Sequence, residues 1–484
     1  MILTDDILLE IFDFYRHTHR DTLWKWHILA HVCRRWRQLV FESPRRLDLK
    51  IRCTTKTRVR ESLSIWPAFP IAIDFNFCFT WFDSIPGNAI AALEHTDRIC
   101  YLELKLTQSP FEKLESGLIP LMASKSFPLL THLIIQAIIC VEDRRAPRHA
   151  LLLPDDFLGG SAPRLQTIHL RSVAFPALQT LLLSASDLVD LQLRSITSAG
   201  YILPVEMVMC LAKLPRLKIL VLQFLSVSSF PDRPDPIHPP PVTRTLLPAL
   251  TNFKVTGTSK YLEDFVAQIV CPRLNQIEIY YLAHVPNPQY AQLTRFFNCS
   301  IPQFMHAKFC FVYDGSVTID LYRPTNHIGW DSHHPATTVI SFDPTANPWD
   351  IHQILNQFSV ILSTVVDLKF VGESLASISL VSLKVIEWLR FFRQLSALQA
   401  LYVSLPLAEG VGRALKSVKG GVVAEALPCL DLIGLEDQAS SIEEFVAVRR
   451  LSDRPLTVVS TEAEFDRARN RGCLMPSVNL DMIL

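Results

Sequence analysis

Two groups of residues have side chains that could carry chemistry. His333 and His334 follow Asp331, and imidazole and carboxylate groups are common metal ligands. Cys33 precedes two arginines, and a thiol beside cations can become a nucleophile. Two adjacent histidines before a proline are more typical of an exposed loop, and Cys33 falls on the apolar stripe of a helix, where thiols are inert. We therefore predict no metal site and no nucleophile.

The sequence contains none of the common catalytic motifs. It has no G-x-S-x-G, no H-E-x-x-H and no G-x-x-x-x-G-K-(S/T), and GVGRALKS near Gly410 lacks the glycine-lysine pair of a phosphate loop. The eleven cysteines are scattered and form no C-x-x-C pair, so they indicate neither a disulfide framework nor a zinc site. We predict a protein that is not an enzyme and needs no cofactor, with cysteines that serve as small buried hydrophobic residues in a reducing compartment.

Length and charge narrow the class of protein. A chain of 484 residues with 49% hydrophobic content exceeds one ordinary domain. Its 47 basic and 47 acidic residues balance, which disfavours a nucleic-acid or anionic-membrane partner. The first residues, MILTDDILLEIF, are acidic, and the longest apolar run, 127–141, is interrupted by polar residues and Pro128. We therefore expect no membrane span and a cytoplasmic or nuclear location.

Two short amphipathic helices are predicted near the start. Thr4 can cap the first helix, and Asp5 and Asp6 lie in its first turn, where the helix dipole favours anions. Its apolar residues, spaced by three and four, are Ile7, Leu8, Ile11, Phe12 and Tyr15. The stripe of the second helix contains Leu29, Val32, Cys33, Trp36, Leu39 and Val40, with Arg34, Arg35 and Arg37 mainly off it. Because two short helices cannot bury an apolar stripe this wide between them, we expect a partner to cover part of it.

These residues resemble the F-box, a docking module that binds a Skp-type adaptor and through it a cullin ubiquitin ligase. The resemblance rests on L-T-D-D-I-L-L-E-I-F, V-C-R-R-W-R-Q-L-V and the following S-P. It implies that the adaptor-binding positions are Leu3, Ile7, Leu8, Ile11, Phe12, Leu29, Val32, Cys33, Trp36 and Leu39. The chain departs from the family at Thr4, where proline is usual, and in a longer stretch before Val32 that carries Trp24 and Trp26.

Later stretches are similar to the F-box proteins expanded in mushroom-forming fungi. They include RRLDLKIRCTTKTRVRESLSIWPAFPIAI, FPALQTLLLSASDLVDLQL, SAGYILPVEM and LLPALTNFKVTGTSKYLEDFVAQI. This resemblance covers most of the chain and implies a class of protein without naming a substrate.

One pattern, P-x-L-x-x-(apolar)-x-(apolar), recurs seven times after the N-terminal region. The copies are PLLTHLII, PRLQTIHL, PALQTLLL, PRLKILVL, PALTNFKV, PRLNQIEI and PCLDLIGL. Copies without proline start at Ile99, Leu188 and Leu398. The pattern is typical of the strand of a leucine-rich repeat, although the spacing is uneven and the usual Asn or Cys is missing. We predict an α/β chain (α+β overall), a small helical F-box followed by an irregular leucine-rich-repeat-like solenoid with a curved parallel sheet.

Residues between the strand leucines should point to the opposite, solvent-facing side of the sheet. They include His132, Gln136 and Thr167. The candidates for substrate contact are His169, Gln192, Arg194, Gln223, Lys254, Glu278 and Tyr280. A mixed polar and aromatic row of this kind is typical of a binding surface, and equally of any solvated sheet face.

The domain boundaries follow from these patterns. We predict the docking module over 1–52, a connecting segment and first strand over 53–98, the repeat domain over 99–459 and a tail over 460–484. A proline-rich insertion (231–241) and an irregular loop (322–350) interrupt the repeats. Helices are expected from Pro204, Ser259 and Pro348, and a helix, turn and strand close the repeats.

The function predicted from the sequence is substrate recruitment to a cullin ligase of the SCF type. The repeat domain would bind a protein substrate while the module binds the Skp-type adaptor. One alternative is an interaction scaffold outside any ligase. A second is a nucleic-acid-associated protein that uses the arginine-rich helix, since residues 1–60 carry 13 basic and 7 acidic side chains. The second is weaker because no further basic patch follows and Trp36 lies on the apolar stripe.

Overall fold

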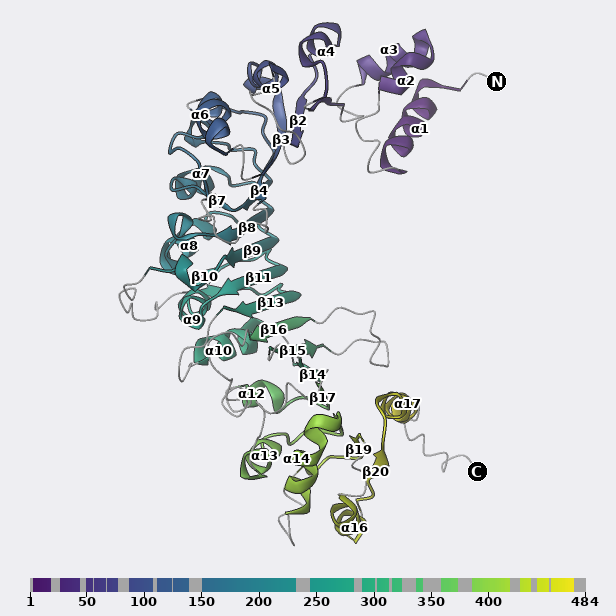
Figure 1. Cartoon of the computed structure of the whole chain (residues 1–484). Coiled ribbons are helices and arrows are strands. Elements are labelled where there is room, and N and C mark those ends of the chain that lie inside the picture. Colours follow the sequence, from purple (N-terminus) through teal and green to yellow (C-terminus); the bar gives the residue numbers. More distant parts are fainter. Residues whose placement is uncertain are drawn as a thin grey trace. The chain divides into compact units, whose positions relative to one another are not determined.

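The computed structural model resolves the chain into two compact units, Met1–Pro234 and Asp235–Leu484 (Figure 1). The described residues are 3–18, 27–43, 49–54, 56–66, 68–76, 87–107, 111–123, 125–138, 150–231, 244–282, 290–300, 303–312, 316–323, 337–342, 358–372, 385–417, 427–436, 442–451 and 454–473.

The first unit begins with three helices, α1 (Asp5–Thr18), α2 (His27–Val32) and α3 (Arg34–Glu42). The second predicted helix is thus divided in two. Cys33 causes the division because its backbone is extended, with φ −157° and ψ 171°, and its thiol accepts the Trp36 N–H at 3.4 Å as the N-cap of α3.

A parallel sheet forms the body of the first unit, in the order β1-β2-β3-β4-β6-β8-β9. The strands are β1 (Ile51–Thr54), β2 (Ile71–Asn76), β3 (Ile99–Thr107), β4 (His132–Ile138), β6 (Thr167–Arg171), β8 (Asp190–Ile196) and β9 (Ile219–Phe224). A small parallel pair joins β5 (Leu151–Leu152) to β7 (Val173–Ala174). The connecting helices are α4 (Val59–Ile65), α5 (Gly87–Leu93), α6 (Phe111–Met122), α7 (Leu178–Ser184) and α8 (Pro204–Leu211), with 3₁₀ turns η2 (Thr96–Arg98), η3 (Leu158–Gly160), η4 (Ser198–Gly200) and η5 (Val227–Ser229). Figure 1 shows α5, α6, α7 and α8 on one side of the strands.

The same backbone pattern starts successive strands. In the turn before β6, the Leu165 N–H donates to the Ala162 carbonyl at 3.1 Å, and Leu130 and Leu217 make the equivalent bond before β4 and β9. At several strands, the carbonyl of the residue just before the strand then accepts two consecutive N–H groups at the start of the next strand. The Thr131 carbonyl accepts from Gln166 and Thr167 at 2.8 and 3.1 Å. These crossovers therefore return the chain at equivalent positions of neighbouring strands.

This register stacks the apolar residues into two continuous rows. One row is Leu102, Leu133, Ile168, Leu191 and Leu220, and the other is Leu104, Ile135, Leu170, Leu193 and Leu222. All are at least 95% buried. A single repeat could not cover these side chains, so the core exists only when neighbouring repeats are stacked.

The second unit contains both parallel and antiparallel strand pairs. Its strand order is β11-β13-β16-β15-β14-β17-β18-β19-β20. The strands are β11 (Asn252–Gly257), β13 (Gln276–Tyr281), β14 (His306–Phe311), β15 (Val317–Tyr322), β16 (Thr338–Phe342), β17 (Asp367–Gly372), β18 (Ala400–Val403), β19 (Leu432–Leu435) and β20 (Thr457–Val459), with a small pair of β10 (Thr245–Leu246) and β12 (Ile269–Val270). β15 runs antiparallel to β14 and β16, whereas β16 is parallel to β13 and β14 is parallel to β17. The helices are α9 (Ser259–Val266), α10 (Ala291–Ser300), α12 (Ser359–Leu362), α13 (Val385–Phe392), α14 (Leu405–Lys416), α16 (Glu443–Leu451) and α17 (Glu462–Cys473).

Six of the seven proline-led motifs form strands, which confirms the predicted repeat class. The exception is PALQTLLL, which forms α7. β6 ends at Arg171 and is parallel to β8, so the residues between them must cross over the sheet, which takes a dozen residues or more. Leu178, Leu181 and Leu182 have helical spacing and are buried in that crossover. The strand instead comes from LVDLQL, the copy without proline.

Several predicted segment boundaries differ from the elements in the structure. The sequence predicts a first strand within 53–98, and the sheet there consists of two strands, β1 from Ile51 and β2, which pair in parallel with each other and with β3, ahead of the repeat domain predicted from residue 99. The predicted loop 322–350 includes β16, whose buried Thr338, Ile340 and Phe342 alternate with half-buried residues. The parallel arrangement is interrupted by β15. The predicted tail includes α17.

The predicted helices at Pro204 and Ser259 are confirmed as α8 and α9, and the last helix and strand as α16 and β20. Several predicted features lie outside the described residues. They are Asp331, His333 and His334, residues 232–241 of the proline-rich insertion, Arg45, Arg46, Trp24 and Trp26, and most of the segment from Pro348.

Buried cysteines account for part of the cysteine content. Cys53, Cys100, Cys210 and Cys271 are buried and free, as predicted, and burial raises the pKa of Cys53 and of Cys271 to about 12. Cys33, Cys299 and Cys429 are exposed, so the prediction of buried thiols is wrong for them. No group of metal-ligating side chains occurs in the described ranges, and no helix there has the length and apolarity to cross a membrane.

Truncating one leucine of the core rows should destabilise the first unit. Leu191 is fully buried, so we expect Leu191→Ala to lower the free energy of unfolding by about 2 to 5 kcal/mol, as for other buried leucines. Leu183 on α7 is 54% exposed, and Leu183→Ala should change it by about 0.5 kcal/mol or less. Urea unfolding followed by circular dichroism measures both, and equal effects would contradict the stacked core.

The second unit should show one pH-dependent contact. Glu263 on α9 accepts the N–H groups of Gln292 and Leu293 in the first turn of α10, at 2.8 and 3.0 Å. Burial raises the pKa of this carboxyl from 4.5 to about 7 despite those bonds. The folded chain therefore holds the proton more tightly than the unfolded chain. The stabilisation is complete below about pH 4.5 and is lost as the pH rises through about 7.

We expect the stability advantage of the wild-type chain over Glu263→Gln to shrink between pH 5 and pH 8. Thermal unfolding of both chains across this range measures it. A constant difference would show that Glu263 does not titrate in the fold.

Candidate interaction surfaces

The N-terminal helices share a small buried apolar core. Leu8, Phe12, Leu29 and Leu39 are between 1% and 9% exposed. The Phe12 ring contacts Trp36 edge-on, with 4.8 Å between the ring centroids. Phe41 of α3 packs against Trp66 and Phe69, which follow α4. These side chains hold the three helices together and to the start of the sheet.

A second set of apolar side chains on the same helices is exposed. On α1 and just before it, Leu3, Ile7, Ile11 and Phe14 are 43%, 47%, 44% and 73% exposed, and their spacing of four, four and three residues puts them on one stripe. On α2, Ile28 and Val32 are 44% and 56% exposed and four residues apart. We call these six residues the outer stripes. Side chains of this size are seldom exposed together unless a partner covers them.

The residues predicted to contact the adaptor fall into two groups. Leu3, Ile7, Ile11 and Val32 are exposed, whereas Leu8, Phe12, Leu29 and Leu39 are buried between the helices. Trp36 is half-buried against Phe12. Cys33 is exposed at the N-cap of α3, so its predicted burial is wrong. The sequence reasoning missed Phe14 and Ile28, although both follow the helical spacing of the stripes.

Two arginines of α3 form hydrogen bonds that connect the three N-terminal helices. Arg35 donates to the Asp5 carboxylate and to the Leu3 carbonyl, and so links α3 to the start of α1. Arg37 donates to the Ala30 carbonyl of α2 at 2.9 Å. Their contacts also make them less available for a nucleic-acid backbone.

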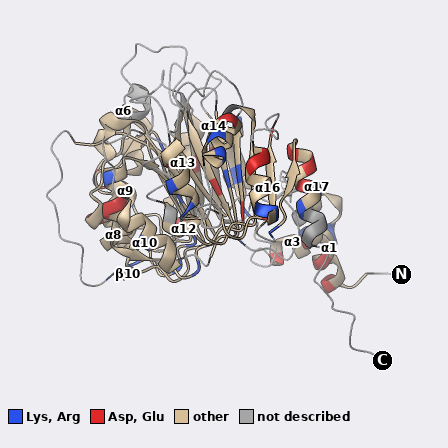
Figure 2. Cartoon of the chain, turned by 90° about the horizontal axis from the view of Figure 1, so that it is seen from below, with Lys and Arg blue, Asp and Glu red and all other residues tan. Residues whose placement is uncertain are grey.

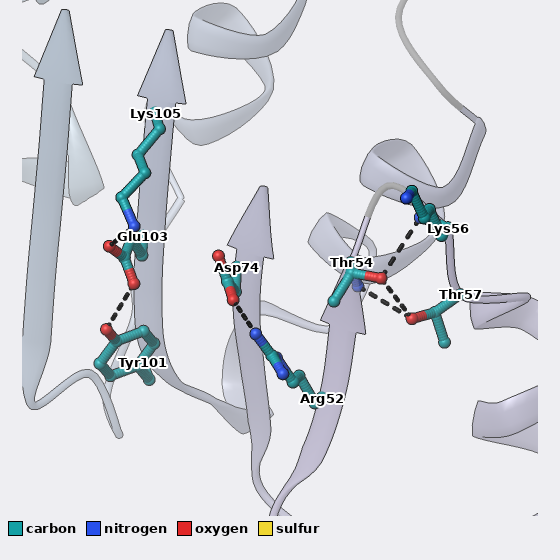
Figure 3. A network of polar contacts seen from close by, with 8 residues as sticks. All are labelled: Arg52, Thr54, Lys56, Thr57, Asp74, Tyr101, Glu103 and Lys105. Atoms are coloured by element: carbon teal, nitrogen blue, oxygen red, sulfur yellow. Dashed lines mark hydrogen bonds and ion pairs between the residues drawn. The ribbon is translucent and has the colours of Figure 1, made fainter. Parts of the chain in front are cut away.

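The strand face of the first unit that lies opposite the helices carries polar side chains in contact with one another (Figure 3). Arg52 of β1 pairs with Asp74 of β2. On β3, the Tyr101 hydroxyl donates to Glu103 at 2.7 Å, and the Lys105 ammonium lies 2.7 Å from the same carboxylate. Burial, and then the bond to Glu103, raise the pKa of Tyr101, so its hydroxyl remains a donor.

Three of the predicted substrate contacts form a second polar chain on β6 and β8. His169 Nε2 lies 2.9 Å from the Asp190 carboxylate, which also accepts from the Gln192 amide at 3.0 Å. The Gln192 carbonyl in turn accepts from Arg194 at 2.9 Å. Gln223 is half-buried on the neighbouring β9.

The remaining predicted contacts come together in the second unit. Lys254 of β11 pairs with Glu278 of β13, and its ammonium lies 4.9 Å from the centre of the Tyr280 ring. The Tyr280 hydroxyl also donates to Glu278 at 3.3 Å. The pKa of Tyr280 is raised by burial and by Glu278. The strand faces therefore combine hydrogen-bonding groups with charges that already have partners of opposite sign.

Positive and negative residues are also mixed on the helices. In Figure 2, α16 and α17 each show both colours. α16 carries Glu443, Glu444, Arg449 and Arg450. Within the described part of the chain, the strand faces thus form a mixed polar surface without the excess of cations that phosphate binding requires.

No protein-family model and no curated protein sequence matches the chain. Solved structures that are similar to it at low identity include the following three. The leucine-rich repeat-containing protein LegL7 from Legionella pneumophila is 15% identical over 73% of this chain and 98% of its own, with a TM-score of 0.27. TLR13, solved in complex with ssRNA13, is 13% identical over 85% of this chain and 48% of its own, with a TM-score of 0.29. A chain of the Rad7 and Elc1 complex from yeast is 11% identical over 95% of this chain and 94% of its own, with a TM-score of 0.24. The chain therefore spans about half of TLR13, and none of these similarities assigns it a function.

The contacts on the strand face should contribute little to stability. Asp190 and His169 keep 18% and 27% of their side chains exposed, and partly exposed ion pairs contribute about 1 kcal/mol or less. We therefore expect Asp190→Ala to lower the free energy of unfolding by about 1 kcal/mol or less, as measured by urea unfolding. A loss as large as that of Leu191→Ala would mean that this face is part of the structural core.

Proposed function

We propose that the chain is a non-catalytic adaptor of a cullin ubiquitin ligase. Its N-terminal helices would dock on a Skp-type adaptor, and its repeat strands would bind a protein substrate. The observation that carries the proposal is the separation of the N-terminal apolar residues into a buried core and exposed outer stripes. This is the arrangement expected of a module that binds a partner through one helical surface.

The resemblance of the first 50 residues to an F-box supports the same role. Residues of the resemblance occur both in the core and in the outer stripes. Apolar docking supplies the affinity, while the charged residues around it influence orientation and rate of association.

The strand faces support the substrate-binding half of the proposal. Their half-buried tyrosines, amides and paired charges can bind another protein through hydrogen bonds and aromatic contacts. The described residues offer no cluster for metal chemistry, and the function of the assembled ligase would depend on catalysis by other subunits.

Replacing apolar residues of the outer stripes on α1 by charged residues should strongly weaken docking on the adaptor. We expect Ile7→Arg combined with Ile11→Arg to reduce capture by a purified Skp-type adaptor at least 10-fold, because both side chains are exposed and apolar. The matched control is Ile65→Arg with Ile386→Arg, two isoleucines that are 71% and 66% exposed elsewhere. Trp36 is left unchanged because it packs on Phe12. Circular dichroism checks the fold of each variant.

Three outcomes separate the functions. Capture by the wild-type and control chains, but not by the α1 variant, supports docking, and ubiquitin linkage to a co-purifying protein then distinguishes a ligase from a scaffold. Failure of the wild-type chain to bind the adaptor contradicts the ligase role. Binding of nucleic acid that falls steeply with salt would favour the arginine-rich helix instead.

A further inference from the structure

The helix α17 covers part of the strand face in the second unit. Figure 1 shows α13 and α14 on one side of β17–β19 and α17 on the other. Local signals form this helix. The Thr461 hydroxyl accepts the Glu464 N–H at 3.2 Å, and the Thr461 carbonyl accepts the Phe465 N–H at 3.0 Å. It therefore docks as a capped helix on a sheet whose leucine core faces the other way.

One aromatic side chain anchors α17. Phe465 is fully buried against Tyr402 of β18 and packs with Ala400 and Leu432. The space for its ring depends on Gly434 of β19. A Cβ atom at that position would lie 2.6 Å from the Tyr402 ring and 3.3 Å from the Phe465 ring. Because Gly434 has no side chain, the aromatic ring of Phe465 can pack against the strands at this position.

Charged contacts surround this anchor. The Lys369 ammonium of β17 lies 2.9 Å from Glu462 and 2.7 Å from Asp466, on successive turns of α17. The Asp367 carboxylate of the same strand lies 2.7 Å from Arg469, one turn further on. Both strand residues are almost completely buried, with Lys369 3% and Asp367 1% exposed, and Asp367 also lies 2.7 Å from His306 of β14.

The composition of this interface suits a reversible contact. Permanent interfaces are usually apolar. Burying an ion pair stabilises an interface little, because both charged groups lose their hydration. If α17 leaves, Lys369 and Asp367 lose their ion-pair partners on the helix, and the apolar surface that opens is that of Phe465 and of the residues packed with it, among them Tyr402, Ala400 and Leu432. The apolar side of the strands, with Leu401, Val403 and Ile433, does not depend on α17, because alternate residues point to opposite faces.

We propose that α17 occupies, within the chain, a helix-docking site on the strand face, and that a partner helix of the same chemistry displaces it. The partner would present the pattern acidic-x-x-aromatic-acidic-x-x-Arg along one face of a helix, as Glu462, Phe465, Asp466 and Arg469 do. This inference deepens the proposed function by naming a class of substrate, and it rests on that function only for the fate of the bound protein. The helix would then act as an internal competitor that a substrate must replace.

The test uses a fluorescent peptide with the sequence of residues 461–472, TEAEFDRARNRG, and the full-length chain. In the chain, Phe465→Ala with Asp466→Lys weakens the internal helix. The peptide should bind this variant at least 10-fold more tightly than the wild-type chain, because the site is vacated in a larger fraction of molecules. A matched control chain carries Leu451→Ala and Glu444→Lys, two exposed positions on α16, and should bind as the wild-type chain does.

A charge reversal tests the proposed recognition. Adding Lys369→Glu to the weakened chain should reduce binding of the wild-type peptide at least 10-fold. The same chain should recover binding to a peptide with Glu462→Lys and Asp466→Lys, since the two ion pairs are then restored with opposite sign. Binding of both peptides to every folded chain alike would contradict a specific site.

Hydrogen exchange on the unmodified chain provides the second measurement. The amides of α17 should exchange at least 100-fold faster than those of β17 and β18, since release of the helix leaves the strands intact. Equal protection would show that α17 is a permanent part of the fold and would overturn the proposal, even if the α17 variant failed to fold. A folded variant that does not bind the peptide would overturn it as well. No adaptor protein takes part, so failure here is distinguishable from failure of adaptor docking.

Discussion

The fold depends on the register of its parallel strand pairs. A carbonyl such as that of Thr131 accepts two consecutive N–H groups at the start of the following strand, so the crossovers that share this pattern return the chain at equivalent positions. The leucines of successive strands then stack into rows that no single repeat could bury. A shift by one residue would turn every leucine outward, so the hydrophobic rows and the hydrogen-bond ladder maintain each other.

The same register leaves the opposite face free for polar side chains. Alternation along each strand puts His169 and Gln192 on this face while Ile168 and Leu191 enter the core. These polar residues contact one another in chains such as His169, Asp190, Gln192 and Arg194. The apolar core and the polar side chains thus lie on different sides of one sheet, and residues of the polar face can vary without opening the core.

The N-terminal helices divide their apolar residues in a comparable way. Leu8 and Phe12 stabilise the three helices, whereas Ile7 and Ile11, one position before each, remain exposed. The arginines that dominate the sequence of α3 mainly connect helices, because Arg35 reaches Asp5 and Arg37 reaches the Ala30 carbonyl. A charged cluster in a sequence can therefore serve the internal structure of a small helical module.

The sequence by itself determined the repeat class, the positions of most strands and the presence of N-terminal amphipathic helices. Those features follow from local periodicity and from the recurring P-x-L turn, which need no knowledge of distant residues. Tertiary structure alone decided which apolar residues are covered. Helical spacing groups Ile11 with Phe12, yet only Phe12 meets Trp36. It also decided that PALQTLLL is a helix, because the crossover between β6 and β8 had to come from that segment. Finally, the place of α17 follows from Gly434 and Lys369, residues that are far from it in sequence and meet it only because the strands are stacked.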